Sequence, residues 1–376
     1  MQRESDNGAM KRRICVFCET WESGGIESFL CSIFSEMDLK ELEIDIVVTE
    51  LSDSIYTEPL KRIGISFRQL SGHKYKFWKN YQSFYRLLKD RRYDVLHLNA
   101  FQALSLIYLF LGKMVGVPVR IAHSHNTDLR NSKTRAVKIL IHRFFRYLLT
   151  GTATEYWSCS EAAGCFMFRL NENKCRFIPN GINIERFRFR AEIRNRVREE
   201  HGWENHFVIG CVGRLCSQKN QEFLLKVCAS ALHSCPNSLL LLVGEGEDRM
   251  KLEQKTQELG ISDSVVFFGV SVQVEQLYWA MDAFAIPSRF EGLGIVAIEA
   301  QAAGLSPVCS EFVPDEVFLP GLARKCSLTA GPDAWAKMLR ETPEHSENAA
   351  TLVARAGYSV KNVTNTVFQC YMGIFS

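Results

Sequence analysis

Short apolar runs alternate with amphipathic segments along the whole chain. In the first half, the runs cover residues 14–17, 43–49, 94–98, 120–123, 156–159 and 176–178. After the first run, apolar residues recur at helical spacing, at Ile26, Phe29, Leu30 and Ile33. Strand-length apolar runs separated by amphipathic helices predict a parallel sheet that helices cover on both faces.

The alternation starts again after a polar stretch at residues 188–201, which we interpret as a linker. In the second half we expect strands at 207–212, 238–243, 265–268, 283–286 and 307–309, and helices at 221–231 and 248–259. The pattern predicts an α/β protein with two Rossmann-like, doubly wound domains, residues 11–187 and 190–356, that face each other across a cleft. The tail, residues 357–376, is expected to form a helix.

Composition narrows the class of protein. Of the 376 residues, 47% are hydrophobic and 23% charged, as in soluble globular proteins with full cores. The apolar run at 103–111 is too short to span a membrane, and the run at 14–17 is too short for a signal peptide. The thirteen cysteines are an odd number and lie mostly in apolar segments, which favours reduced thiols in a cytoplasmic protein. Cys15 and Cys18 have zinc-ligand spacing, but no second pair completes a set.

Positive charge is concentrated in the first half. Residues 1–190 hold 29 Lys or Arg and 20 Asp or Glu, a net charge of +9, whereas residues 191–376 hold 16 and 22, a net charge of −6. Residues 130–149 combine basic residues with an apolar, partly aromatic stripe, and a second basic cluster covers residues 74–92. Two interpretations stay open: a helix that meets an anionic membrane, or a helix that faces the core with its charges in solvent. No recognised nucleic-acid-binding module occurs, so we expect no nucleic acid partner.

The strongest motif covers residues 289–300, which follow a predicted strand and open a helix. Gly292 and Gly294 allow the backbone to approach a ligand closely, and the helix N-terminus offers free N–H groups to an anion. Glu291 would lie in the loop, and Glu299 on the helix about two turns further on. Two carboxylates so placed suit hydrogen bonds to the hydroxyls of a hexose and a ribose. The alternative, two solvated glutamates, is disfavoured by the glycines between them.

A second loop of interest, residues 213–220, follows the first predicted strand of the second half. Arg214 and Lys219 can clamp a diphosphate from two sides, the first through paired hydrogen bonds and the second as a point charge. Fixed cations there would stabilise the negative charge that a departing nucleoside diphosphate gains. The alternative is a solvated basic loop.

Two histidines and a glycine pair follow strands in the first half. His123 and His125 lie at the carboxyl end of a strand, where ligands bind in open α/β sheets. Either can be a structural residue instead, and we favour a ligand-facing role for His123 over His125. Gly24 and Gly25 form a strand-to-helix turn that can approach a phosphate, although such pairs are also common in ordinary turns.

Together these segments resemble the retaining glycosyltransferases of family 4, which have the GT-B fold. Two further segments match in order: the strand-ending Gly-x-Gly at 244–246, and residues 268–270, which are similar to the backbone that reads the donor base. The resemblance therefore extends over nearly the whole chain. Asn220 stands where the family usually has a glycine, and residues 315–317 are also less typical.

The resemblance assigns roles to particular residues. It implies a catalytic set of His123, Glu291, Arg214 and Lys219. It also implies a donor-binding set of Gly24, Gly25, Arg214, Lys219, Gly244, Val270, Gly292, Leu293, Gly294, Ile295 and Glu299. The N-terminal domain would bind the acceptor and be joined by the C-terminal helix, and residues 190–356 would bind the nucleotide sugar.

The reaction implied is transfer of a hexosyl unit from a nucleotide diphosphate sugar, which we expect to be a UDP-sugar, with retention. The leaving phosphate would take the acceptor's proton, and Glu291 would hold sugar hydroxyls. Because no Asp-x-Asp motif occurs, we expect no metal cofactor. The acceptor would be a glycan or lipid-linked molecule of capsule or exopolysaccharide synthesis, reached at the inner face of the cell membrane.

Two other functions remain as alternatives. A nucleotide-sugar epimerase or hydrolase would need a further acid/base set around the sugar, and none is identified. A non-catalytic partner of an active transferase would be expected to lack Arg214, Lys219, Glu291 or Glu299, and all four are present. A nicotinamide dehydrogenase is excluded because no complete dinucleotide fingerprint follows any strand.

Overall fold

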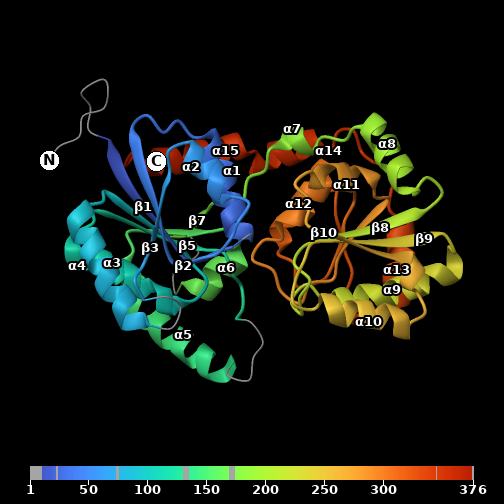
Figure 1. Cartoon of the computed structure of the whole chain (residues 1–376), viewed down its shortest axis with the longest axis horizontal. Helices are drawn as coiled ribbons and strands as arrows, with labels where there is room; N and C mark the ends of the chain where they lie inside the picture. The colour runs from blue at the N-terminus through green and yellow to red at the C-terminus, as the bar shows by residue number, and fades with distance from the viewer. Residues whose placement is uncertain are drawn as a thin grey trace. The chain divides into compact units, whose positions relative to one another are not determined.

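The computed structural model describes residues 11–22, 24–72, 76–129, 135–168, 174–343 and 345–374. They divide into two compact units (Figure 1). Unit 1 contains the described residues up to Gly181 and those from Val360 onward, and unit 2 is Ile182–Ser359. Among the described helices, none has both the length and the apolar character needed to cross a bilayer.

Unit 1 is built on a parallel sheet with the strand order β3-β2-β1-β4-β5-β6-β7. Its strands are β1 Arg12–Trp21, β2 Leu42–Leu51, β3 Ser66–Gln69, β4 Val95–Ala100, β5 Val119–Ser124, β6 Glu155–Ser158 and β7 Arg176–Phe177. Its helices are α1 Gly25–Glu36, α2 Thr57–Arg62, α3 Phe77–Arg91, α4 Leu106–Val115, α5 Arg135–Leu149, α6 Glu161–Met167 and α15 Val360–Tyr371. In the register of the sheet, Ile14 of β1 pairs with Ile44 and Val95 of the flanking strands.

The sheet of unit 1 is buried on both faces, because successive side chains of a strand point to opposite sides. On β1, Ile14 and Val16 pack in a core with α1 and α15, whereas Cys15 and Phe17 pack in a core with α3 and α4. The two pairs of helices lie on different sides of the sheet in Figure 1. A strand buried on both faces is almost continuously apolar, which explains the unbroken run at 14–17.

The strand geometry also decides the question of zinc. Cys15 and Cys18 are buried on opposite faces of β1, so they cannot converge on one ion. Within the described part of the chain, no group of three or more His, Cys, Asp or Glu residues is arranged to hold a metal ion. All thirteen cysteines are free thiols.

Unit 2 is built on a parallel sheet with the order β10-β9-β8-β11-β12-β13. Its strands are β8 Phe207–Val212, β9 Ser238–Val243, β10 Val265–Gly269, β11 Ala283–Ile286, β12 Val308–Cys309 and β13 Arg324–Lys325. Its helices are α7 Ile184–Phe187, α8 Ala191–His201, α9 Gln221–Ser234, α10 Arg249–Glu258, α11 Val274–Ala280, α12 Ile295–Ala302, α13 Gly331–Arg340 and α14 Ala349–Val353. Since β8 and β11 are neighbours, the loops at their carboxyl ends meet.

The two doubly wound sheets confirm the predicted fold class. The expected strands at 238–243 and 283–286 coincide with β9 and β11. The strands β3 and β13 were not predicted. Both lie at sheet edges and contain polar residues, so neither has the apolar run that marks a central strand.

The prediction of a linker at residues 188–201 was wrong. Residues 191–201 form α8, and its Arg198 is buried. The Arg198 guanidinium donates to Asp282 at 2.9 Å and to the Ala280 carbonyl at 2.8 Å. The stretch is polar because it supplies cations to a buried acceptor set, and only the folded chain provides that set.

We expect Asp282→Ala to lower the free energy of unfolding by about 3 kcal/mol, because it leaves the charge of Arg198 buried without its partner. The substitution also removes an acceptor for the Val208 N–H, which lies 2.7 Å from the carboxylate. Thermal and urea unfolding of the variant should be compared with those of Asp263→Ala, which removes an exposed carboxylate of the same unit. Equal stability of the two variants would contradict the role given to this ion pair.

Candidate active site

In unit 2, a largely buried ion pair joins the loops that follow β8 and β11. The Nζ of Lys219 lies 2.7 Å from Oε1 of Glu291, and the Ser288 hydroxyl donates to the same oxygen at 2.6 Å. Only 5% of Glu291 is exposed, and these two partners compensate the carboxylate for its lost contact with water. Burial opposes the charge on Lys219, but the Glu291 carboxylate outweighs it and holds the pKa of Lys219 above its ordinary value.

Asn220 fixes the two loops to each other. Its backbone has φ of 56°, a left-handed conformation that favours glycine, and Asn adopts it more readily than most residues. Its side chain donates to the Pro287 carbonyl at 3.1 Å and accepts from Arg289 at 3.0 Å. The departure from the usual glycine therefore keeps the required backbone conformation and adds two hydrogen bonds between the loops.

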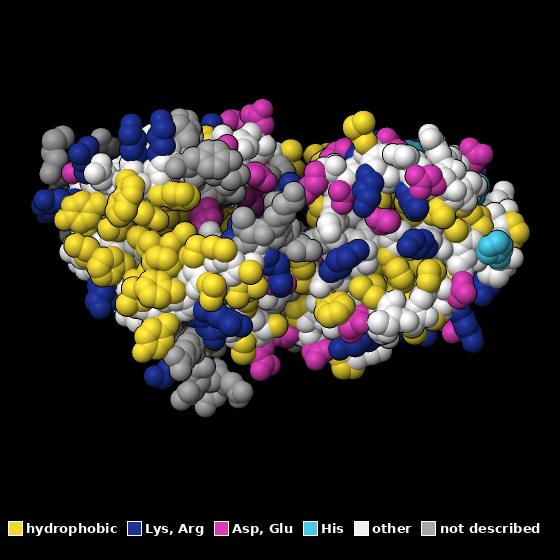
Figure 2. All heavy atoms as spheres, turned by 90° about the horizontal axis from the view of Figure 1, so that it is seen from below, with side chains coloured by type: hydrophobic (Ala, Val, Ile, Leu, Met, Phe, Trp, Pro, Cys, Tyr) yellow, Lys and Arg dark blue, Asp and Glu magenta, His cyan; other side chains and the backbone are white. Residues whose placement is uncertain are grey.

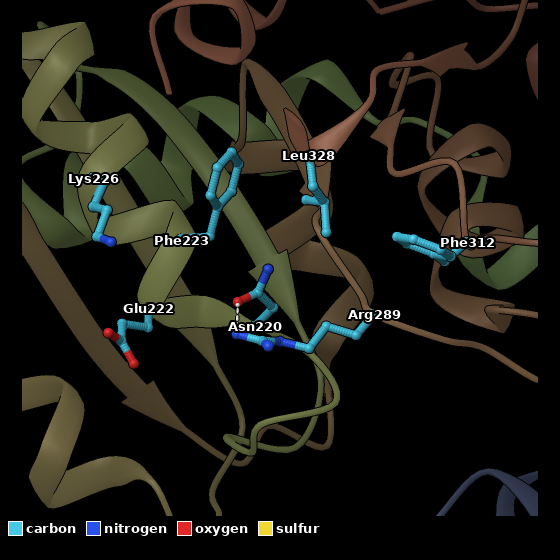
Figure 3. A pocket seen from close by; sticks show the side chains of 7 residues that line it. All are labelled: Asn220, Glu222, Phe223, Lys226, Arg289, Phe312 and Leu328. Carbon is cyan, nitrogen blue, oxygen red and sulfur yellow. Dashed lines mark hydrogen bonds between the residues drawn. The ribbon is translucent and has the colours of Figure 1, made fainter. Parts of the chain in front are cut away.

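Asn220 and Arg289 also form one wall of a pocket of about 460 Å³ (Figure 3). Its other lining residues are Glu222, Phe223, Lys226, Phe312 and Leu328. None of the residues predicted to bind the donor lines this pocket. It lies beside the loops of the ion pair, and we assign it no ligand.

Glu299 lies on α12, and Glu291 lies in the loop before that helix, as predicted. Gly294 caps the helix with φ of 83°, so its left-handed conformation suits glycine. The Tyr278 hydroxyl donates to Oε2 of Glu299 at 2.9 Å. Burial raises the pKa of Glu299, and the hydrogen bond from Tyr278 opposes that shift. No sequence motif identifies Tyr278 as a partner of Glu299, because it lies on a different helix, α11.

The other cation of the predicted clamp is more exposed. Arg214 follows β8, and its Nε lies 3.0 Å from Glu247 at the surface. Gly244 packs against this loop: a Cβ at its position would lie 2.2 Å from the carbonyl oxygen of Gly213. The structure thus gives Gly244 a structural reason to be glycine, in addition to its predicted place near the nucleotide.

The remaining residues predicted to bind the donor lie at the same ends of the strands of unit 2. Val270 follows β10 and is 60% exposed. Gly292 and Leu293 lie in the loop before α12, and Ile295 is the first residue of that helix. Leu293 is buried, with 2% of the residue exposed.

In unit 1, a buried carboxylate holds the glycine turn. Glu27 accepts from the backbone N–H of Glu22 at 3.0 Å and from that of Gly24 at 3.2 Å. Burial raises the pKa of Glu27, and these backbone hydrogen bonds oppose the shift. Gly25 is the first residue of α1. We had not assigned a role to Glu27 from the sequence.

His123 ends a chain of buried hydrogen bonds. Its Nδ1 lies 3.1 Å from Nε2 of His97, whose Nδ1 lies 2.7 Å from the Tyr371 hydroxyl on α15. The Nε2 of His123 is buried and has no hydrogen-bond partner in the described part of the chain. If Tyr371 and His97 each donate toward His123, the proton of His123 lies on Nε2, ready to donate to a ligand.

The histidines of this cluster are held neutral by burial. Burial lowers the pKa of His97 to about 3 and that of His123 well below its ordinary value, and nearby His125 adds to both shifts. His125 is bonded through Nε2 to Asn99 at 2.9 Å, and burial lowers its pKa to about 3. A neutral His123 suits hydrogen bonding to a sugar better than pairing with a phosphate.

Two protein-family models match this chain. Residues 23–186 match the model described as Glycosyltransferase Family 4, and residues 193–342 match Glycosyl transferases group 1. The two matches follow one another and together extend over most of both units. The chain belongs to the family 4 glycosyltransferases of the GT-B fold.

Relatives of this glycosyltransferase occur among bacterial proteins. EpsF of Bacillus subtilis, a protein assigned as a glycosyltransferase, is 26% identical, and the alignment covers 97% of each chain. An Escherichia coli enzyme, UDP-Gal:alpha-D-GlcNAc-diphosphoundecaprenol alpha-1,3-galactosyltransferase, is 24% identical over 62% of each chain.

Solved structures share the fold. HepE of Anabaena in complex with UDP-glucose has a TM-score of 0.76 at 19% identity, covering 96% of this chain and 99% of HepE. Sucrose-phosphate synthase of Thermosynechococcus elongatus has a TM-score of 0.74 at 17% identity, and the alignment covers 97% of this chain and 99% of the synthase. At this level of identity the similarity shows a common fold.

The buried histidines predict a pH dependence of stability. Their folded-state pKa values lie below the ordinary value of 6.5. As pH falls below that value, the unfolded chain takes up protons that the folded chain refuses, so stability is lost between about pH 6.5 and about pH 3. We expect the midpoint of thermal unfolding to fall over this window, and His125→Asn to make the fall less steep.

The matched control is His233→Asn, which removes an exposed histidine. The raised pKa of Glu27 acts in the opposite direction, but it is common to all variants and cancels in the comparison. The contrary result is a midpoint of thermal unfolding that falls equally steeply with pH in the wild type, His125→Asn and His233→Asn. That result would mean that His125 takes up protons equally in the folded and unfolded chains.

Proposed function

We propose that this glycosyltransferase moves a hexosyl unit from a UDP-sugar to a glycan or lipid-linked acceptor, with retention and without a metal ion. The name of the Escherichia coli relative supports the choice of donor and acceptor, since it specifies UDP-Gal and a diphosphoundecaprenol-linked acceptor. The UDP-glucose bound to HepE agrees with the same nucleotide. Polysaccharide biosynthesis is the corresponding pathway class.

The observation that carries the proposal is the ion pair of Lys219 and Glu291. An ammonium group has three N–H donors, and the bond to Glu291 uses one of them. Lys219 can therefore bind a phosphate oxygen while Glu291 keeps it in place and charged. Arg214, in the same loop, and the N-terminus of α12 add positive potential for a diphosphate without a metal ion.

In the reaction we propose, the bond between the anomeric carbon and the phosphate oxygen breaks as an acceptor oxygen bonds to that carbon from the same face. The acceptor's hydroxyl proton passes to the departing phosphate oxygen, so no protein base is needed. Lys219 stabilises the negative charge that grows on the diphosphate. Glu291 orients Lys219 and accepts hydrogen bonds from the sugar, and His123 donates to the sugar through Nε2.

Glu299 is the proposed partner of the ribose hydroxyls. Its Oε2 already accepts from Tyr278, so Oε1 is the oxygen that we assign to the ribose. The raised pKa of Glu299 reflects burial, which also strengthens a hydrogen bond from a ligand hydroxyl.

Calorimetric titration with UDP, with and without EDTA, tests the proposal. We expect the same affinity in both conditions, and Glu299→Ala to weaken binding by about 1–3 kcal/mol because a ribose hydroxyl loses its buried partner. Glu347→Ala, which removes an exposed carboxylate of unit 2, should bind as the wild type does.

Other outcomes of this titration have definite meanings. Binding of GDP or ADP in place of UDP would keep the enzyme class and change the donor. Loss of affinity in EDTA would overturn metal independence. A protein that binds no nucleotide would instead be a non-catalytic partner of another transferase.

A further inference from the structure

The helix α5 turns its apolar face away from unit 1. Five apolar residues at helical spacing are each 40% or more exposed: Val137 (56%), Leu140 (66%), Ile141 (40%), Phe144 (61%) and Leu148 (58%). The spacing places them on one side of the helix. A helix that packs an apolar stripe on a core would show the opposite pattern, so the core-facing interpretation of this segment was wrong.

Polar side chains on the opposite side of α5 hold it to the protein. His142 is buried, accepts from the Ala103 N–H through Nδ1 at 3.1 Å, and bonds the Phe166 carbonyl through Nε2 at 3.0 Å. One turn later, Arg146 donates to the Phe168 carbonyl at 2.8 Å. Together with Leu149 and Phe145, which pack in the core with α3 and α4, these bonds hold this side of α5 inward. The exposed apolar face therefore results from the packing of the folded unit.

Neighbouring elements extend the apolar surface. The helix α4 packs against α5 and exposes Phe110 (41%) and Met114 (60%) one turn apart. The helix α3 packs against α4 and exposes Phe77 (52%) and Trp78 (81%) at its start. Figure 2 shows apolar side chains gathered over this face of unit 1, with basic side chains around them. Continuous apolar surfaces of this kind are uncommon on proteins that meet only water.

The charges around this surface have one sign. The helices α3, α4 and α5 carry nine Lys or Arg residues and a single acidic residue, Asp90. Exposed Lys138 and Arg143 flank the apolar stripe of α5 on either side, and Lys113 lies beside Met114 on α4. Lys74, Arg130 and Lys133, which also belong to the basic segments of the sequence, lie outside the described residues.

We propose that the apolar face of α5, together with Phe110 and Met114, docks on an anionic lipid bilayer. In this arrangement α5 lies in the plane of the headgroups, its apolar stripe reaches the acyl chains, and Lys138, Arg143 and Lys113 pair with lipid phosphates. The almost complete lack of acidic residues favours a lipid surface over a second copy of this chain, because two such faces would repel each other. The proposal concerns unit 1 alone and does not depend on the donor or acceptor.

Sedimentation of the full chain with vesicles tests the docking. We expect binding to vesicles that contain phosphatidylglycerol, weak binding to pure phosphatidylcholine, and a loss of binding at high salt. The double substitution of Leu140→Ser and Phe144→Ser should weaken the partition by at least about tenfold, because two exposed apolar side chains no longer enter the bilayer. Lys138→Glu with Arg143→Glu should weaken it by roughly tenfold or more.

Matched controls place equivalent changes elsewhere. Met250→Ser with Leu352→Ser removes exposed apolar residues from unit 2, and Lys337→Glu with Arg340→Glu reverses exposed charges on α13. Both controls should bind vesicles as the wild type does. Thermal unfolding confirms that the α5 variants are folded, since the substituted residues are exposed.

A fluorescent reporter locates the contact. The tryptophan emission of Phe144→Trp should shift to shorter wavelength when phosphatidylglycerol vesicles are added, and that of Met250→Trp should not.

The proposal is overturned if the wild type does not bind anionic vesicles, or if the α5 variants bind them as well as the controls do. It is also overturned if analytical ultracentrifugation shows a dimer that the α5 substitutions dissociate, because the face would then be covered by a second copy. UDP titration of the α5 variants tests the proposed function separately, because a variant can lose membrane binding and still bind UDP.

Discussion

A largely buried ion pair, the Lys219 ammonium beside the Glu291 carboxylate, holds together the loops that carry the candidate site of unit 2. Removing either partner would leave the other charge poorly solvated and uncompensated, which is strongly destabilising. Together they are stable, and Ser288 and Asn220 complete the hydrogen bonding of the loops. The cation is therefore in place before any ligand binds, which is the condition for it to stabilise developing charge without reorganisation.

Burial has the opposite consequence in unit 1. Among the described residues, no carboxylate is hydrogen-bonded to His97, His123 or His125, and burial keeps these histidines neutral. Tyr371, from the last helix of the chain, is bonded to His97, which is bonded in turn to Nδ1 of His123. With the Tyr371 hydroxyl as the donor, the proton of His123 lies on Nε2. Unit 2 thus holds a fixed charge, whereas unit 1 holds neutral imidazoles.

The position of α5 follows from the same balance of polar and apolar burial. A helix with this stripe would ordinarily bury it, and the free energy of that burial is lost when the stripe is exposed. The bonds of His142 and Arg146 to backbone carbonyls and to an N–H hold the other side inward. The apolar stripe and its flanking cations are then available to a surface outside the protein, which is the basis of the membrane proposal.

Local patterns in the sequence were sufficient to predict the architecture and to select candidate site residues that lie within one loop or helix. Apolar runs identified most strands, because a strand buried on both faces leaves a continuous local signal. Glu291, Glu299, Arg214 and Lys219 were found because each belongs to a short segment with a recognisable spacing. The edge strands β3 and β13 and the helical state of residues 191–201 were not predicted, because their residues are polar for reasons that lie elsewhere in the fold.

Only the tertiary structure decided which partners these residues have. Tyr278 reaches Glu299 from another helix, Tyr371 reaches His97 from the far end of the chain, and Asp282 neutralises Arg198. The periodicity of α5 defined an apolar stripe but not its direction, because that depends on acceptors at Phe166 and Phe168. The sequence determined what each segment could form, and contacts between distant segments determined which charges are buried and which surfaces remain exposed.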